Sequence, residues 1–424
     1  VEVRAPVAEA VVGAIATYLD FLGVTPAELA ELRHVLMGLA ARLATERIDE
    51  SGIVRLRGLL EAERKAAADG AGTAEHQLDF YATVAELADN PALSLFWSVL
   101  IQRLVRPLMS STPDPAEIAR SHDDHQSVVR AIVSGDASGA EARMRDHLSR
   151  RHDTVVKAIE TGAIALDPKR YDADVLDALG LPIVVDREGA REKLPARVAR
   201  ELKDLIVEGG FETGEVIGME SELLERFGVS RSVFREAVRI IEFYGLAEMR
   251  RGPRGGLTVR EPDAAVMEEA VISYLEFMGI GLDRLLEIRI PLELMNVEWA
   301  IERGRGGLDT LVDVVEDEPV GALPVRRFEV HELLSRLSGN RASVLFTAVL
   351  SKLIDRHVLP SAPMPDVSEE ERATLERRGH SEHVEIVAAV VAGDVALARH
   401  RMLRHLEFIS VQFDRLARWH RDRG

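Results

Sequence analysis

Apolar residues recur every three or four positions through the first and last parts of the chain, which is the spacing of amphipathic helices. Two clear examples are Leu285, Ile288, Leu292 and Met295, and further on Ile386, Val387, Val390 and Val391. Alternating runs typical of strands are few there. Gly393 is placed to end one helix and Asp394 to cap the next. The pattern therefore predicts a mainly α protein built from antiparallel helical bundles.

The chain also repeats itself. Tyr18–Val24 resembles Tyr274–Ile280 at an offset of 256, Asn90 matches Asn340 at 250, and Gly135-Asp136 matches Gly393-Asp394 at 258. Small drifts in the offset are what loops of unequal length between fixed helices produce. We predict two copies of one helical domain, copy one at residues 1–162 and copy two at residues 261–424. Residues 163–190 are the expected linker, and residues 191–260 form an unpaired insert.

The insert has a different pattern. An apolar helix face begins at Leu194 and ends at Gly209-Gly210, and a short helix follows over Glu220–Phe227. Ser230 is a good N-cap for a third helix that reaches about Tyr244. Two short strands are predicted next, at Leu246–Met249 and Leu257–Val259. This order indicates a winged helix-turn-helix with a small β-wing.

Positive charge gathers on one side of the predicted third helix. At 100° per residue, Arg231, Arg235 and Arg239 fall within about 80°, opposite the apolar residues. Such a stripe is often only a solvated surface, but arginine and serine at a helix start are typical of a recognition helix on DNA. In the wing, Arg251 and Arg254 can follow phosphates or enter a minor groove. A nucleotide-binding loop is the competing interpretation of this glycine-rich stretch, and it lacks the Gly-Lys-Ser/Thr ending.

Net charge at first argues against a nucleic-acid partner. The chain has 53 Lys and Arg against 71 Asp and Glu, a net of −18. The charge is segregated, however: residues 226–260 contain eight basic and three acidic residues, a net of +5. This segment holds the predicted recognition helix and wing. The acidic total therefore comes from the helical copies and leaves DNA binding open.

Composition narrows the remaining classes. The chain has no cysteine, which excludes disulfides and thiolate metal sites. No apolar stretch approaches the roughly 20 residues of a membrane span, so we expect no membrane partner and a cytoplasmic protein. The sequence begins at Val1, and Val3-Arg4-Ala5-Pro6 resembles Val259-Arg260-Glu261-Pro262 at the end of the wing. We expect a first winged helix to precede Val1 in the complete protein.

The insert strongly resembles the winged helix of the GntR family. The resemblance rests on Gly228-Val-Ser-Arg231 and Arg235-Glu-Ala237, with Glu242-Phe-Tyr-Gly-Leu further on. The flanking copies resemble the helical ligand-binding domain of its FadR-like branch, the FCD domain. The resemblance implies a transcriptional regulator that binds double-stranded operator DNA and whose helical domain senses a small molecule.

The same resemblance implies which residues touch DNA. Arg231, Ser232 and Arg235 match the family's DNA-contacting positions, and Gly255 or Gly256 matches its wing tip. Ser221 stands where many members have a further DNA-contacting arginine, which puts the usual operator preference in question. The helical domains of the family pair, so we expect a homodimer or a pseudo-dimer within one chain.

Many FCD domains hold a metal with an aspartate and three histidines. In copy two the histidine positions correspond to His331, His383 and His405, and the aspartate position holds Arg327. Three imidazoles suit Zn²⁺ or Ni²⁺, whereas the guanidinium opposes a cation. A polar pocket without metal is the alternative. Copy one retains His125 and His147 but has Tyr81 and Gln77 at the other positions, so we expect no metal there.

An anionic effector could also be held by cations directly. Arg289, Arg327 and the three histidines of copy two are the candidate effector ligands, because guanidinium groups grip carboxylates with charge-assisted bonds. Two alternatives remain open. One is a metal-dependent hydrolase built on the histidine cluster, for which the sequence offers no positioned general base. The other is a regulator whose pockets bind no ligand, for which copy one is the better candidate.

Overall fold

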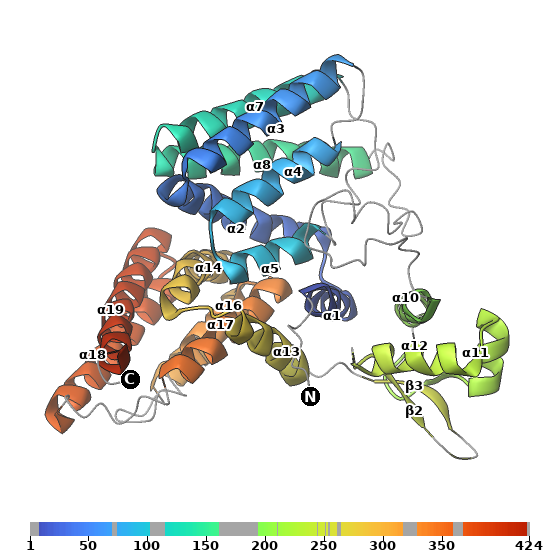
Figure 1. Ribbon diagram of the computed structural model, residues 1–424. Helices are drawn as coiled ribbons and strands as arrows, with labels where there is room; N and C mark the ends of the chain where they lie inside the picture. The colour runs from blue at the N-terminus through green and yellow to red at the C-terminus, as the bar shows by residue number, and fades with distance from the viewer. Residues whose placement is uncertain are drawn as a thin grey trace. The chain divides into compact units, whose positions relative to one another are not determined.

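A computed structural model of the chain confirms a mainly α protein with one small sheet (Figure 1). The structure describes residues 8–69, 74–101, 115–160, 194–209, 211–243, 245–250, 252, 255–260, 264–316, 329–358 and 368–421. Within these residues, none of the helices combines the length and the apolar character that a membrane crossing requires.

Copy one consists of helices throughout its described residues. They are α1 (Ala8–Phe21), α2 (Pro26–Arg47), α3 (Glu50–Ala68), α4 (Ala74–Leu87), α5 (Pro91–Leu100), α7 (Pro115–Val133) and α8 (Ala137–Glu160). Helix α2 packs on α8 and α4, and α7 packs on both α8 and α3. The predicted helix break is confirmed: Gly135 has φ 77°, and the Asp136 carboxylate accepts from the Gly139 N–H at 2.9 Å.

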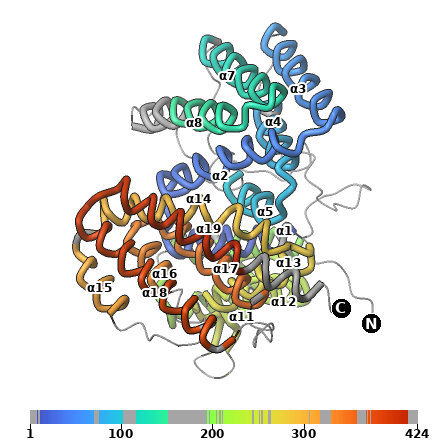
Figure 2. Tube along the Cα trace, turned by 90° about the vertical axis from the view of Figure 1, so that its left-hand side faces the viewer, coloured from blue at the N-terminus to red at the C-terminus, as the bar shows by residue number. Residues whose placement is uncertain are grey.

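Copy two repeats these elements in the same order. They are α13 (Ala264–Phe277), α14 (Leu282–Arg303), the 3₁₀ turn η3 (Arg305–Gly307), α15 (Leu308–Glu316), α16 (Glu329–Leu337), α17 (Arg341–Val358), α18 (Glu369–Val391) and α19 (Val395–Arg421). Helices α18 and α19 lie side by side (Figure 2), and α14 packs on α19 and α16. Gly393 (φ 73°) and Asp394, which accepts from the Leu397 N–H at 3.0 Å, separate α18 from α19 as predicted.

The insert folds as a winged helix-turn-helix. Its elements are α10 (Leu194–Glu208), β1 (Val216–Gly218), α11 (Glu220–Phe227), α12 (Arg231–Phe243), β2 (Ala247–Arg250) and β3 (Gly256–Val259). The three predicted helices and two predicted strands are present. Strand β1 was not predicted, and it completes an antiparallel sheet of order β1-β3-β2. Phe234, Ala237 and Ile241 of α12 lie in the core that the insert's helices form with this sheet.

Spatial proximity divides the chain into two compact units. One consists of Val1–Val24 and Asp167–Val271, and the other of Thr25–Leu166 and Ile272–Gly424. The second unit therefore contains nearly all of both helical copies, and within it α14 contacts α2 and α5 while α17 contacts α2. The bounds of the four segments expected from the sequence stay predictions.

Candidate functional site

Helix α12 presents a polar face at its first two turns. Gly228 adopts a left-handed conformation (φ 61°) that ends α11, and the Ser230 hydroxyl accepts from the Val233 N–H at 3.4 Å where α12 begins. The side chains of Arg231 and Arg235 are 67% and 64% exposed. Ser232 is exposed beside them. A rigid, buried helix base therefore carries two exposed guanidinium groups and a hydroxyl, a set that can bond to phosphates and base edges.

Both arginines lie near one carboxylate in the chain without DNA. Glu220 Oε1 is 3.4 Å from Arg231 Nε and 3.3 Å from Arg235 Nε. Exposed pairs of this kind contribute little to stability. Phosphates can therefore replace Glu220 as the partner of the two guanidinium groups at small cost. Ser221 is exposed next to Glu220 at the start of α11, on the helix-turn-helix rather than in its core.

The wing residues fall into two groups. Arg251 and Arg254 lie outside the described residues. Gly255 and Gly256 are buried at the start of β3, where Gly256 has φ 148°. A Cβ at Gly256 would lie 2.6 Å from the Gly218 carbonyl oxygen of β1. Glycine is thus required at position 256 for the close approach of two strands, a structural role separate from the DNA contact expected there.

The three histidines predicted for copy two come together. His331 of α16, His383 of α18 and His405 of α19 are each at most 2% exposed. One ligand atom from each lies within 4.8 Å of the others, and His383 Nε2 is 3.1 Å from His405 Nε2. A tetrahedral zinc site with bonds of about 2.0–2.1 Å needs nitrogens roughly 3.3 Å apart. The separation of His383 and His405 is close to that value, and all three ligand atoms lie within 4.8 Å.

Two carboxylates orient these rings. Glu293 of α14 bonds to His331 Nδ1, and Glu382 Oε2 lies 2.9 Å from His405 Nδ1. A carboxylate on Nδ1 fixes the proton there and leaves the Nε2 lone pair for the centre of the cluster, the arrangement found around metal-bound histidines. Nε2 atoms of His383 and His405 in contact repel unless a cation or proton lies between them. The donor set therefore fits a divalent metal.

Burial favours the neutral form of the His331 ring, although the charge of Glu293 favours the protonated form. Burial lowers the pKa of the His331 imidazole, and nearby Arg289 adds to that effect. Burial alone would raise the pKa of Glu293. The interactions with Arg289 and His331 outweigh burial and lower the pKa from 4.5 to about 2. Glu293 is therefore ionised and His331 can present a lone pair to a metal.

Of the two predicted effector arginines, only one is described. Arg289 is buried on α14 and donates from Nε to Glu293, which places it beside the histidine cluster. On α17, burial raises the pKa of Asp355 to about 6 despite the charge of Arg289. Arg327 lies outside the described residues.

Copy one builds a related but different pocket. His125 Nε2 lies 3.2 Å from His147 Nε2, and the Tyr81 hydroxyl is 2.5 Å from the same His147 nitrogen. The Asp124 carboxylate accepts from His147 Nδ1 at 3.0 Å, so the proton of this ring is on Nδ1. His147 Nε2 therefore accepts a hydrogen bond from the Tyr81 hydroxyl. The Gln77 amide donates to Ser121 at 3.3 Å. The Tyr81 hydroxyl is thus the third donor of the copy-one pocket, at the position where copy two has His331.

The carboxylates that orient the histidine rings were not predicted from the sequence. Asp124 and Glu382 each precede a histidine of the pair spaced by 22 residues, at equivalent positions of the repeat, so the repeat contained the signal for them. Glu63 of α3, which bonds to His125 Nδ1 at 3.0 Å, and Glu293 of α14 come from different parts of the bundle. No spacing in the sequence indicates those two.

Comparison with protein families matches nearly three quarters of the chain. The FCD domain matches residues 28–150 and 284–408, and the gntR family of bacterial regulatory proteins matches residues 194–258. The two helical copies and the insert are therefore matched separately, in the order expected from the repeat.

Individual relatives point the same way. The HTH-type transcriptional repressor NanR of Citrobacter rodentium is 26% identical over 243 residues, which are 55% of this chain and 88% of the relative. NanR of an Enterobacter species is 27% identical over 239 residues, 54% of this chain and 87% of the relative. These relatives are repressors rather than enzymes, which does not favour the hydrolase alternative. Among solved structures, a Streptococcus agalactiae GntR protein is 23% identical, with a TM-score of 0.38 over 51% of this chain and 98% of its own.

Proposed function

Because this chain belongs to the GntR family of regulators with FCD domains, we propose that it binds operator DNA through α12 and releases or tightens that grip when copy two binds a small organic anion. The observation that carries the DNA part is the exposure of Arg231, Ser232 and Arg235 on a helix whose other face is buried. A regulator of this kind works in the cytoplasm, on double-stranded DNA.

The DNA contact would be made by two elements. Arg231 and Arg235 would bond to phosphates or guanine edges, and Ser232 to a phosphate. Ser221 at the start of α11 would lie over the adjacent backbone. The wing would add Arg251 and Arg254, with the backbone of Gly255 and Gly256 close to the duplex.

Copy two would hold the metal. His331, His383 and His405 would supply three neutral nitrogens to Zn²⁺ or Ni²⁺, each suited to imidazole ligands. When bound, such a metal offers an open coordination position that a carboxylate oxygen can fill. Three neutral ligands leave the positive charge of the ion unneutralised, which favours an anionic effector.

Arg289 would strengthen that preference. It lies beside the cluster and pairs with Glu293, so an incoming carboxylate can bond to the guanidinium as well as to the metal. Arg327 is the second proposed cation. The effector class we propose is therefore a small organic acid.

The experiment starts with selection of bound fragments from genomic DNA by the full chain. Fluorescence anisotropy then measures affinity for a selected fragment. Arg235→Ala should weaken binding by about 1–3 kcal/mol, since it removes a base or phosphate contact. The exposed Arg64→Ala on α3 is the matched control and should change affinity little. Equal losses in the two variants, or affinity that does not fall with salt, would contradict a specific role for α12.

A screen of organic acids against the protein–DNA complex tests the sensing part. At least one acid should change DNA affinity, and removal of metal by a chelator should abolish that response. DNA binding that responds to no acid, with or without added Zn²⁺, would favour the alternative of a regulator that binds no ligand.

A further inference from the structure

The two helical copies meet across an interface built from equivalent elements. Helices α2 and α14, which are equivalent in the repeat, contact each other. Helix α2 also contacts α17, and α14 contacts α5, which is the equivalent of α17. Phe96 of α5 stacks on Phe346 of α17 with ring centroids 3.9 Å apart. These two residues are equivalent in the repeat, 250 positions apart, so the stack marks a pseudo-two-fold axis.

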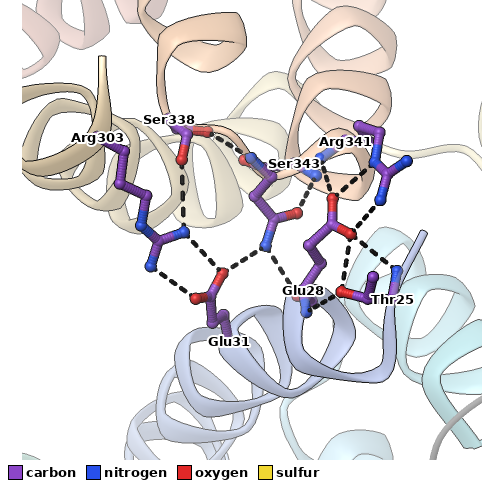
Figure 3. Close-up of polar contacts among 8 residues, drawn as sticks. Thr25, Glu28, Glu31, Arg303, Ser338, Arg341 and Ser343 are labelled. Carbon is purple, nitrogen blue, oxygen red and sulfur yellow. Dashed lines mark hydrogen bonds and ion pairs between the residues drawn. The ribbon is translucent and has the colours of Figure 1, made fainter. Parts of the chain in front are cut away.

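Most polar contacts of this interface obey that symmetry. The Asn340 amide donates to the Glu28 carbonyl at 2.8 Å and to Glu31 at 3.0 Å. The equivalent Asn90 donates to the Arg284 carbonyl at 2.8 Å and to Glu287 at 3.0 Å. Two ion pairs follow the same rule: Arg303 binds Glu31 at 2.6 Å, and Arg47 binds Glu287. Figure 3 shows one half of this arrangement.

One position breaks the symmetry by a reversal of charge. Position 28 of copy one is glutamate, and its equivalent in copy two is Arg284. Glu28 accepts from the backbone N–H and the Nε of Arg341, both at 2.9 Å, and from Arg341 Nη2 at 2.7 Å (Figure 3). On the other side, Arg284 Nη2 binds Asp89 at 2.7 Å. Each of the two residues faces the opposite charge on the other copy.

The partners differ between the copies as well. Arg341 corresponds to Pro91, which has neither a charge nor a backbone N–H to offer. Asp89 corresponds to Gly339, and both adopt a left-handed backbone, with φ 47° and 72°. Among the described residues, Asp89 is the single non-glycine residue with positive φ. A carboxylate thus occupies a backbone position that favours glycine, in the one copy where it meets an arginine.

These differences decide which copies can pair. If two copies of type two met in the same geometry, Arg284 of each would face Arg341 of the other, and no carboxylate would replace Asp89. If two copies of type one met, Glu28 of each would face Asp89, and Pro91 would donate nothing. Unlike copies gain two ion pairs, whereas like copies place equal charges together twice. Like charges placed next to each other in an interface strongly disfavour association with the wrong partner.

We propose that this charge reversal makes copy one pair with copy two of the same chain and opposes pairing of like copies between chains. The family's helical pair would then be closed within one polypeptide. This pairing depends on the interface between the copies alone and not on the operator, the effector or the metal. Glu28–Arg341 carries more of the selectivity than Arg284–Asp89, because the side chains are 10% and 45% exposed in the first pair and 25% and 75% in the second.

The test exchanges the two reversed residues in the full chain. Glu28→Arg with Arg284→Glu keeps composition and net charge. Within a chain, the exchange places a second guanidinium against Arg341 and a second carboxylate against Asp89, and it makes both like pairings attractive. Sedimentation velocity without DNA measures mass over a range of concentrations, and urea unfolding measures the midpoint. The matched control exchanges two residues of copy one that lie outside these contacts, Glu46→Arg with Arg57→Glu.

We expect the native chain and the control to sediment as one chain, and the exchange variant to form two-chain species at concentrations at least tenfold lower, with a lower urea midpoint. Adding Asp89→Arg and Arg341→Glu to the exchange restores both ion pairs and should restore the single-chain mass. The urea midpoint should recover in part, because the bonds from Thr25 to Glu28 at the start of α2 are not regained. A mass and midpoint unchanged by the exchange would overturn the proposal. So would a four-residue variant that forms two-chain species at the same concentrations as the exchange variant, or whose midpoint is no higher than that of Glu28→Gln, which loses the charge at position 28 without reversing it.

Discussion

The pockets of the two copies share a scaffold and differ in one donor. Both place a pair of histidines 22 residues apart on neighbouring helices, His125 with His147 and His383 with His405, and a carboxylate orients the second ring of each pair. The third corner is the Tyr81 phenol in copy one and an imidazole in copy two. A phenol brings its own proton to the lone pair it faces, whereas a neutral imidazole brings another lone pair.

The third donor therefore differs in what it can offer a metal: a hydroxyl that is already engaged with His147 in copy one, and a third imidazole nitrogen in copy two. In copy one the Tyr81 hydroxyl donates to His147 Nε2, the nitrogen that also lies 3.2 Å from His125 Nε2. In copy two His383 Nε2 and His405 Nε2 lie 3.1 Å apart, a contact that either a shared proton or a bound cation satisfies.

The largest effect should come from removing a nitrogen of the copy-two cluster. His383→Ala deletes one of three ligands, so affinity for Zn²⁺ should fall by more than about 100-fold. This loss is larger than the one expected when a residue that only orients a ligand is mutated. Isothermal titration of the full chain measures this. His125→Ala, the equivalent change in copy one, should leave Zn²⁺ affinity unaltered, and equal losses in both variants would remove the distinction between the copies.

The comparison can also be reversed by giving copy one a third imidazole. Tyr81→His should create a second Zn²⁺ site, raising the binding stoichiometry in titration from one to two. The new ring lacks an orienting carboxylate, because Met37 stands where copy two has Glu293. Adding Met37→Glu should tighten the second site by about 10–100-fold. A stoichiometry that stays at one in both variants would mean that the third donor is not what distinguishes the pockets.

A smaller effect is expected from the carboxylates that orient the rings. Glu382→Ala frees the His405 ring and should weaken Zn²⁺ binding by about 10–100-fold, while Glu382→Gln, which can still accept from Nδ1, should lose less. Asp124→Ala is the control in copy one. If Asp124→Ala weakened Zn²⁺ binding as much as Glu382→Ala, the metal would not be confined to copy two.

The smallest effect concerns stability against acid at position 28, where the copies carry opposite charges. Burial raises the pKa of Glu28, but bonds from Arg341 and Thr25 lower it from 4.5 to about 2. The stabilisation is therefore present above pH 4.5 and lost as pH falls toward 2. Glu28→Gln should cost about 1–2 kcal/mol at neutral pH, since Arg341 is partly exposed to solvent. Urea unfolding at pH 7 and pH 3 should show the difference shrinking, and a constant difference would contradict it.

Much of this fold follows from the sequence because its signals are local or repeated. Ser230, the Gly135 and Gly393 breaks and the apolar helix faces act within a few residues, so the helices were predicted correctly. Strand β1 was missed because its three residues have no periodicity and depend on pairing with β3. The roles of Glu293 and Glu63 also required the tertiary structure.

Comparison of the two copies also identifies residues at the interface between them. Residues that are identical between the copies, such as Glu31 with Glu287 and Asn90 with Asn340, lie at the interface between the copies. The proposed roles of the two copies rest on residues that differ between them, Glu28 with Arg284 and Tyr81 with His331. Which side chains meet across an interface depends on packing that spacing alone does not determine.

The number of Zn²⁺ ions bound per chain tests the account most directly. The full chain is dialysed against a chelator and then against Zn²⁺, and the bound metal is measured by mass spectrometry against protein concentration. The account predicts one ion per chain, lost in His383→Ala and retained in His125→Ala. Two ions, or none, would contradict the division of the chain into a structural copy and a metal-binding copy.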